Sequence, residues 1–93
     1  MQLHASVDTG RVQLVLGLLR DDEVVEATGF VMPRGDHETI AGMVLARLGR
    51  IPDVGATVDV DGWRLTVMRR DRNRIAELRL ADPDAVAEAR RAR

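Results

Sequence analysis

The segment from Leu48 to Val67, LGRIPDVGATVDVDGWRLTV, constrains the fold of this chain most strongly, because it joins a helix end to a β-hairpin. Gly49 follows an apolar run with helical spacing, where a left-handed cap is favoured, and Pro52 prevents the helix from continuing. Asp61-Gly62 then predicts a two-residue turn between two segments that alternate apolar and polar residues. The segment therefore predicts a helix that leads into an antiparallel pair of strands.

The rest of the chain supplies the remaining elements, because alternation of apolar and polar residues predicts strands and helical spacing predicts helices. Four strands are expected, at residues 12–16, 57–60, 63–70 and 74–80. One helix is expected from a cap at Asp21 to Gly29, and a second from His37 to Leu48 with Asp36 as its N-cap. These elements predict an α+β fold, an antiparallel sheet of about four strands with two helices on one face.

Two positions break the local rules. Gly42 lies inside the second helix, where glycine costs about 1 kcal/mol relative to alanine, so we expect another backbone to approach closely there. Ile75 is out of phase with Leu78 in the last strand. This mismatch predicts either a bulge near Ala76-Glu77 or a strand buried on both faces.

The two ends of the chain are expected to lie outside the main domain. Residues 1–11 show no periodicity and are interpreted as a linker, and residues 12–80 are expected to form the domain. Asp82-Pro83 pairs a cap with a first-turn proline, which predicts a third helix in a tail over 81–93.

Composition excludes several classes of protein. The 93 residues carry a formal net charge of −1, which gives no long-range attraction to nucleic acid or to an anionic membrane surface. The absence of cysteine excludes disulfides, thiolate catalysis and cysteine-based zinc sites. No apolar run reaches the roughly 20 residues of a membrane span, and no signal peptide is evident. One soluble domain that binds no nucleic acid is expected.

No residue pattern predicts a metal site. Asp36-His37-Glu38 places three ligand types side by side at a helix start, where adjacent residues point in different directions. Asp59 and Asp61 share a strand face but lack the carboxylate density of a calcium loop. We therefore expect no metal ligand in this chain.

No pattern predicts catalysis either. Ser6 is the sole serine and belongs to no nucleophile motif, and Asp21-Asp22 is typical of a helix start rather than of an acid/base pair. The glycines form no phosphate-binding loop. The chain is therefore predicted not to be an enzyme, with no catalytic residue and with its cofactor-binding residues unknown.

An arginine-rich hairpin and a single tryptophan are the remaining notable features. The hairpin carries Arg69, Arg70, Arg72 and Arg74. It is interpreted either as an anion or partner contact or as a solvated turn whose arginines pair with Asp59 and Asp61, and the second is favoured. Trp63 is expected to anchor the core, with half-exposure at a subunit interface as the alternative.

The same residues carry a family resemblance. The segment LGRIPDVGATVDVDGWRLTV is similar to the signature of the CorC/HlyC transporter-associated domain. The stretch from Ala27 to Pro52, with Thr39 and Gly42, resembles the family's loop and Thr-x-x-Gly helix, and RIAELRL over 74–80 resembles its closing strand. The resemblance extends over roughly residues 12 to 80 and implies a fold similar to part of an FAD-binding fold.

The resemblance also implies a function. Such domains are C-terminal, cytoplasmic parts of CorC-like or hemolysin-like membrane proteins implicated in magnesium and cobalt efflux. The implied partners are a pair of CBS modules and a transmembrane cation-transport domain, and a homodimer is left open. The chain is thus expected to be a non-catalytic regulatory domain without a cofactor. The alternative is a domain that binds a small ligand, FAD or an adenine nucleotide.

Overall fold

The computed structural model describes residues 5–7 and 11–92, and for residues 5–7 it describes the backbone alone. It contains five strands and three helices, in the order β1 (Ala5–Val7), β2 (Val12–Leu16), α1 (Asp21–Thr28), α2 (Ile40–Leu48), β3 (Thr57–Val60), β4 (Trp63–Asp71), β5 (Arg74–Ala81) and α3 (Pro83–Arg91).

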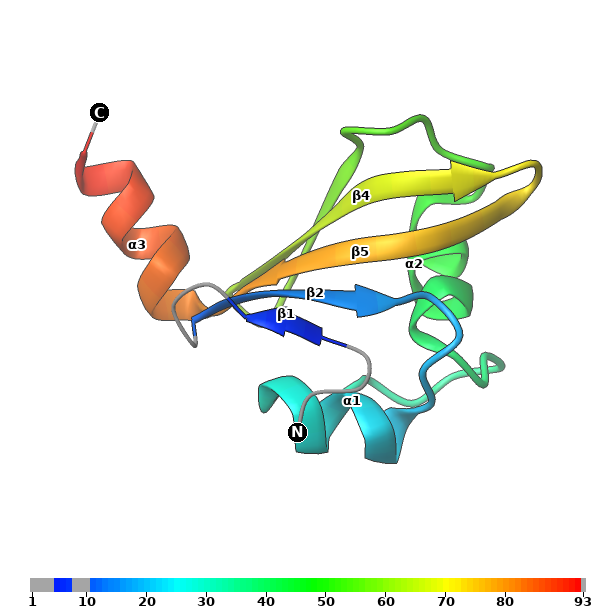
Figure 1. Cartoon of the computed structure of the whole chain (residues 1–93), viewed down its shortest axis with the longest axis horizontal. Helices are drawn as coiled ribbons and strands as arrows, with labels where there is room; N and C mark the ends of the chain where they lie inside the picture. The colour runs from blue at the N-terminus through cyan, green and yellow to red at the C-terminus, as the bar shows by residue number, and fades with distance from the viewer. Residues whose placement is uncertain (1–4, 8–10, 93) are drawn as a thin grey trace.

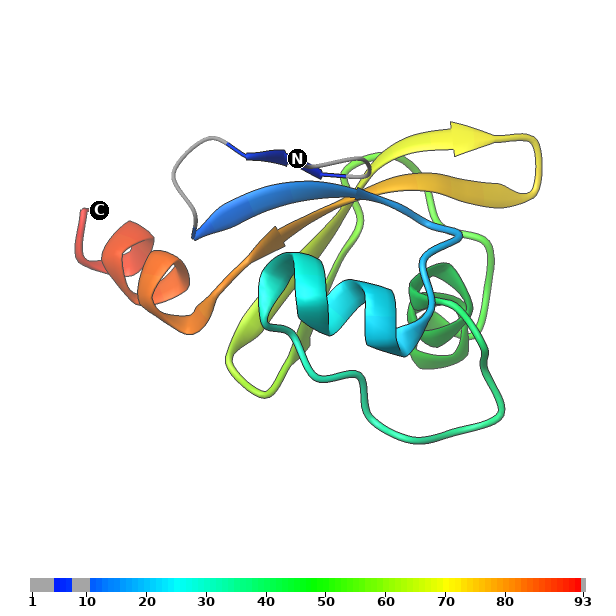
Figure 2. The ribbon, with the colours of Figure 1, turned by 60° about the horizontal axis from the view of Figure 1, so that its bottom comes forward.

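The strands form one antiparallel sheet in the order β1-β2-β5-β4-β3 (Figure 1). The helices α1 and α2 lie on the same side of the sheet, and α3 extends from the end of β5 (Figure 2). The predicted α+β class and the placement of two helices are confirmed. The sequence predicts a linker over residues 1–11, but three of them form the short strand β1, which pairs with β2. These residues show no periodicity that predicts this strand.

The hydrophobic core lies between the sheet and the helices α1 and α2. Its central row crosses three strands, since Val15 pairs with Leu78 and Leu78 pairs with Val67. All three side chains are buried, and they meet apolar residues from the helices and from the loop after α1. The fully buried members with the largest side chains are Phe30, Ile40, Met43, Leu65, Leu78 and Leu80.

The start of α1 differs by one residue from the prediction. Arg20 is the N-cap in extended conformation, and Asp21 already belongs to the helix. The backbone N–H of Arg20 donates to the Glu23 carboxylate at 2.9 Å, and the carboxylate of Asp21 accepts from the N–H of Asp22 at 2.8 Å. The predicted end at Gly29 is confirmed by its left-handed φ of 86°.

The prediction that Asp36 caps α2 is wrong. The helix begins at Ile40 rather than His37, and Thr39 is its N-cap, with a hydroxyl that accepts from the N–H of Gly42 at 3.1 Å. Thr39 is held there because its backbone forms a bridge with Arg20, which keeps it extended. The cap is therefore selected by a tertiary contact.

The predicted bulge near Ala76-Glu77 is confirmed. In the β4–β5 ladder Val67 faces Leu78 and Arg69 faces Glu77, so Met68 has no partner of its own. Arg70 then faces Ile75, which leaves Ala76 as the extra residue on β5. Two opposed irregularities restore the register and bring Ile75 to the buried side, where its exposed fraction is 3%.

The close backbone approach lies at Gly17 and not at Gly42. A Cβ added to Gly17 would stand 2.1 Å from the carbonyl oxygen of Ile75. A Cβ added to Gly42 would meet the Cβ of His37 at 3.3 Å and the hydroxyl of Thr39 at 3.4 Å, both from the segment just before its own helix. The expectation that another element approaches Gly42 is therefore wrong, although the site is tight.

The predicted third helix is confirmed as α3. The carboxylate of Asp82 accepts from the N–H of Ala85 at 2.9 Å, and Pro83 occupies the first turn. Val86 is buried, and Pro83 lies against Gly62 in the β3–β4 turn. That turn has positive φ at Asp61 and Gly62, as the Asp-Gly pair predicts.

Candidate functional site

In Figure 2, α1 and α2 lie on one side of the sheet, and no helix of the described residues covers the other side. We call it the open face. The residue pairs of the ladders define its central row, in which Leu14 faces Arg79, Arg79 faces Thr66, and Thr66 faces Thr57. The row thus crosses four strands and places an arginine at the centre, between an apolar side chain and two hydroxyls.

The charged residues beside this row form pairs. The guanidinium of Arg64 donates to both carboxylate oxygens of Asp59, at 3.0 and 3.3 Å, and this hydrogen bond is the chief reason that the pKa of Asp59 is lowered. Arg69 lies 3.5 Å from the carboxylate of Glu77. The side chain of Arg79, which is half-buried, has no ion pair or hydrogen bond with any described residue. A half-buried, unpaired guanidinium at the centre of the face favours a carboxylate or phosphate from a partner.

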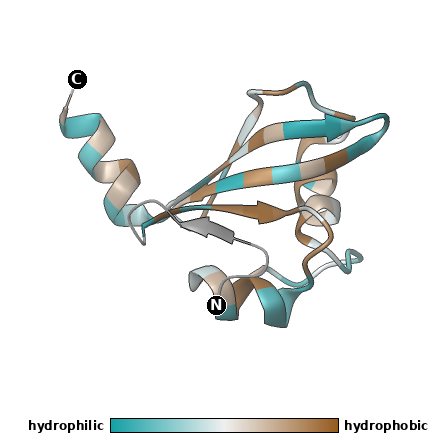
Figure 3. Cartoon of the chain, in the orientation of Figure 1, coloured by the Kyte–Doolittle hydropathy of each residue, from teal (hydrophilic) through white to brown (hydrophobic). Residues whose placement is uncertain are grey.

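An apolar strip runs beside Arg79 along β2. Val12 and Leu14 are half-buried and Leu16 is 39% exposed, all on the open face. Met68, displaced by the bulge in β4, is 41% exposed. Figure 3 shows β2 as hydrophobic, while the far end of β4 is hydrophilic. The open face therefore combines apolar area with one unpaired cation, as the centres of protein interfaces do.

The arginine-rich hairpin between β4 and β5 does not pair as the sequence predicts. Arg70 donates to the Asp53 carboxylate at 3.2 Å and to the Pro52 carbonyl at 3.3 Å, so it ties the hairpin to the loop before β3. Because Arg69 pairs with Glu77, the expected pairing of the cluster with Asp59 and Asp61 is wrong. Asp59 instead forms an ion pair with Arg64, a residue of β4 that lies outside the cluster.

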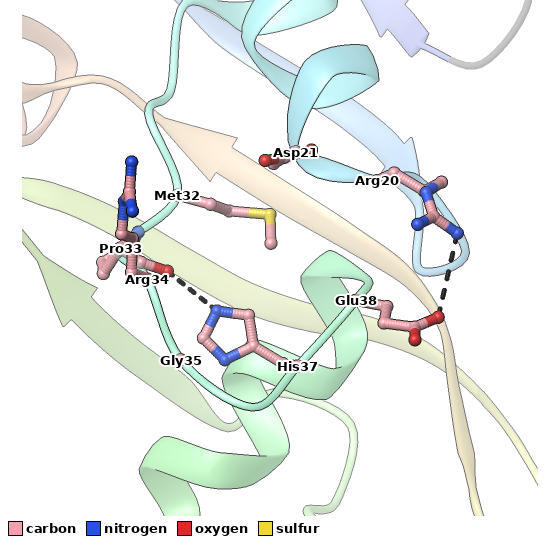
Figure 4. Close-up of a pocket in the computed structure, with 8 residues that line it drawn as sticks. All are labelled: Arg20, Asp21, Met32, Pro33, Arg34, Gly35, His37 and Glu38. Atoms are coloured by element: carbon pink, nitrogen blue, oxygen red, sulfur yellow. Dashed lines mark hydrogen bonds and ion pairs between the residues drawn. The ribbon is translucent and has the colours of Figure 1, made fainter.

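A concavity of about 350 Å³ lies between the start of α1 and the loop before α2 (Figure 4). Its His37 ring nitrogen Nε2 lies 2.8 Å from the Pro33 carbonyl oxygen, and Arg20 lies 3.8 Å from the carboxylate of Glu38. The side chains of His37 and Glu38 thus make separate contacts, and Asp21 and Arg34 complete the charged lining. Among the described residues no three histidine, aspartate or glutamate side chains are grouped to hold a metal ion.

This concavity does not fit a flavin dinucleotide. At about 350 Å³ the concavity is near the lower end of the range of about 300–1,000 Å³ that is typical of pockets for drug-sized ligands. A flavin dinucleotide is larger than most ligands of that size. The lining carries two arginines, Arg20 and Arg34, and two carboxylates, Asp21 and Glu38, so it has no excess of positive charge for a diphosphate. A bound flavin would therefore need surface from outside this chain.

Trp63 packs as the sequence predicts. It is half-buried against the core, and its ring meets Phe30 edge to face, with centroids 5.3 Å apart. Sequence reasoning gave no role to Arg79 or Gly17. Alternation alone places Arg79 on the polar side of its strand, but its position at the centre of the open face follows from the pairing of two neighbouring strands.

The geometry defines a class of protein: a small two-layer α+β domain with shallow concavities and a sheet face that no described helix covers. The sequence matches the CorC_HlyC family, described as the transporter associated domain, over residues 7–84. The chain belongs to this family. In the part of the chain that the structure describes, no helix has the length and apolar character needed to cross a membrane.

Named relatives agree with this assignment. The chain is 45% identical to UPF0053 protein MT1890 of Mycobacterium tuberculosis, over 80% of this chain and 19% of that protein. It is 31% identical to the magnesium and cobalt efflux protein CorC of Escherichia coli K12, over 75% of this chain and 24% of that protein. The chain therefore spans about a fifth to a quarter of the length of these curated relatives.

Solved structures of related domains have the same fold. The transporter associated domain of a Xylella fastidiosa hemolysin is 30% identical, with a TM-score of 0.73 over 89% of this chain and 99% of that chain. A hemolysin domain from Enterococcus faecalis is 28% identical, with a TM-score of 0.74 over 84% of this chain and 95% of that one. A further structure of the Xylella domain, at 32% identity and a TM-score of 0.71, is a complex with Mg²⁺ and Mn²⁺, with 84% of this chain and 95% of that chain covered.

Proposed function

We propose that this chain is a non-catalytic regulatory domain of a CorC-like membrane protein that exports magnesium or cobalt ions. The open face carries this proposal, because it joins exposed apolar side chains to an unpaired arginine at the centre of the sheet. Two facts support the assignment to a larger protein. The chain covers 24% of the CorC relative from Escherichia coli, and that relative is named as a magnesium and cobalt efflux protein.

In this proposal the domain acts from the cytoplasmic side of the membrane as the C-terminal part of the parent protein. Its open face contacts the CBS pair or the transmembrane cation-transport domain, or a second copy of itself. Contact with Arg79 requires an acidic group on the partner, because an unpaired guanidinium desolvated at an interface is costly without one. The domain thereby restrains the relative motion of the modules that control transport.

The direct test removes the domain from the parent protein. The full-length protein and a version that lacks residues 12–81 of this chain are reconstituted at equal density in vesicles loaded with Mg²⁺ or Co²⁺, and the rate of efflux is measured. We expect the shortened protein to transport the ion at an altered rate. An unchanged rate would refute a regulatory role. Complete loss of transport, with correct insertion shown by protease accessibility, would refute an accessory role.

A further inference from the structure

A groove of about 310 Å³ lies between α2 and the tip of the β4–β5 hairpin, away from the open face. Its lining includes Leu18, Ala41, Leu45 and Ile75. Figure 1 shows the hairpin end and α2 at one end of the molecule, with α3 at the other end. The groove is thus a second surface, built by different elements.

The groove is apolar and has a floor of backbone. Leu18 stands at its side with 70% of its surface exposed, while Ile75 is 3% exposed below it. Gly17 has no side chain, and its backbone therefore lies directly against the carbonyl of Ile75 in the floor of the groove. An apolar side chain from a partner would therefore bury the exposed Leu18 against backbone and half-buried Leu45.

One end of the groove is positively charged. Arg74 and Asn73 line both the groove and an adjoining concavity of about 460 Å³ at the hairpin tip, to which Arg72 and Asp71 also belong. Within the described residues, the side chains of Arg72 and Arg74 have neither an ion pair nor a hydrogen bond, in contrast to the paired Arg69 of the same hairpin. Asp71 is the single carboxylate lining these two concavities, so an excess of positive charge remains.

We propose that this groove binds an acidic segment of the parent protein, with an apolar side chain beside Leu18 and a carboxylate at Arg72 and Arg74. The proposal rests on the proposed function, because it places this chain within a larger protein. Charge complementarity selects the occupant, since an apolar side chain fits the floor and an anion fits the unpaired arginines. One excess charge is too little for a polyanion such as nucleic acid, which several phosphate contacts would hold.

Cysteine reactivity measures the occupancy of the groove, because the chain contains no cysteine. Leu18→Cys places a thiol in the groove, and Val31→Cys is the matched control, since both native side chains are 70% exposed and Val31 does not line the groove. Each variant is alkylated with a maleimide in the 93-residue chain and in the full-length parent protein from which other reactive cysteines have been removed. For each site the ratio of the two rates is reported.

We expect alkylation at position 18 to be about tenfold slower in the parent, which corresponds to a groove occupied about 90% of the time. Alkylation at position 31 is expected to stay within about twofold in the parent, which serves as the reference for an unoccupied site. Equal rates at position 18 in the isolated chain and in the parent would overturn the proposal.

Charge reversal tests the nature of the occupant. In the Leu18→Cys parent, the double substitution Arg72→Glu with Arg74→Glu is expected to restore fast alkylation, whereas Arg91→Glu on α3 at the other end of the molecule is not. Each variant is also measured in the isolated chain, because nearby arginines change the reactivity of the thiol itself. Protection that survives the double reversal would show that the occupant is not acidic and would refute that part of the proposal.

These results separate the groove from the proposed function. Slow alkylation at position 18 in a parent whose efflux does not depend on the domain would refute regulation and support the groove. Altered efflux on removal of the domain, together with equal alkylation rates at position 18, would support regulation and refute the groove.

Discussion

Substitution of Gly17 by alanine tests the packing that joins the sheet to α2. The Cβ of an alanine at this position would lie 2.1 Å from the carbonyl oxygen of Ile75 and 3.0 Å from the Cβ of Ala41. An ordinary contact begins at 3.4 Å, so the backbone of β5 or of the segment after β2 has to move by more than an ångström. Neither neighbour is the flexible end of a side chain.

The cost follows from what this movement disrupts. Gly17 donates its N–H to the Ala76 carbonyl at 2.9 Å and accepts from the N–H of Ala41 at 3.0 Å. Overpacking costs about 1–3 kcal/mol, and each of the two hydrogen bonds contributes about 0.5–1.5 kcal/mol. Gly17→Ala is therefore expected to lower the free energy of unfolding by about 2–6 kcal/mol, a large part of the roughly 5–15 kcal/mol typical of a domain.

Urea unfolding followed by tryptophan fluorescence measures this effect, because Trp63 is the only tryptophan and its ring packs on Phe30. Two glycines provide controls. Gly29 has a φ of 86° and no atom within 4 Å of an added Cβ, so Gly29→Ala costs only the left-handed conformation, about 1–2 kcal/mol. At Gly42, a gain in helix propensity of about 1 kcal/mol opposes tight contacts, which keeps Gly42→Ala within about 1 kcal/mol of the native chain.

A Gly17→Ala variant that unfolds within about 1 kcal/mol of the native chain would refute this reasoning, because overpacking alone is expected to cost at least that much.

Two smaller effects test the cap of α2 and a pair on the open face. Thr39→Ala should cost about 1 kcal/mol in urea unfolding, and Asp36→Ala much less; equal losses would contradict the assignment of the cap to Thr39. Since the hydrogen bond from Arg64 lowers the pKa of Asp59, the pair stabilises the fold above the ordinary pKa of aspartate and loses this effect as pH falls through the lowered value. Arg64→Met should therefore flatten the decline in stability as pH falls below the ordinary pKa of aspartate, and an unchanged decline would show that the pair contributes nothing.

The elements that local rules decide could be predicted from the sequence. The Asp61-Gly62 turn, the left-handed end of α2 at Gly49 and the cap at Asp82 each depend on neighbours within a few residues. The bulge at Ala76 was also predictable, because a break in alternation has to be absorbed inside the same strand.

The features that depend on tertiary contacts could not be predicted. Asp36 and Thr39 both have side-chain acceptors, and the bridge between Arg20 and Thr39 decides which of them caps α2. Gly17 cannot accept a side chain, because the carbonyl of Ile75, which is distant in the sequence, lies against it in the fold. No local sequence pattern signals that contact. Arg79 lies at the centre of the open face because of the register of its strand with two neighbouring strands. The centre of the candidate site is therefore defined only once the sheet has formed.

Charge reversal at Arg79 tests most directly whether the open face transmits regulation. Arg79→Glu and the control Arg91→Glu are introduced into the full-length parent protein, and Mg²⁺ or Co²⁺ efflux is measured in vesicles at equal protein density. The urea midpoint of each variant of the 93-residue chain verifies folding. We predict that Arg79→Glu alters the efflux rate as removal of the domain does, while Arg91→Glu leaves it unchanged. Native efflux from a folded Arg79→Glu protein would contradict the account.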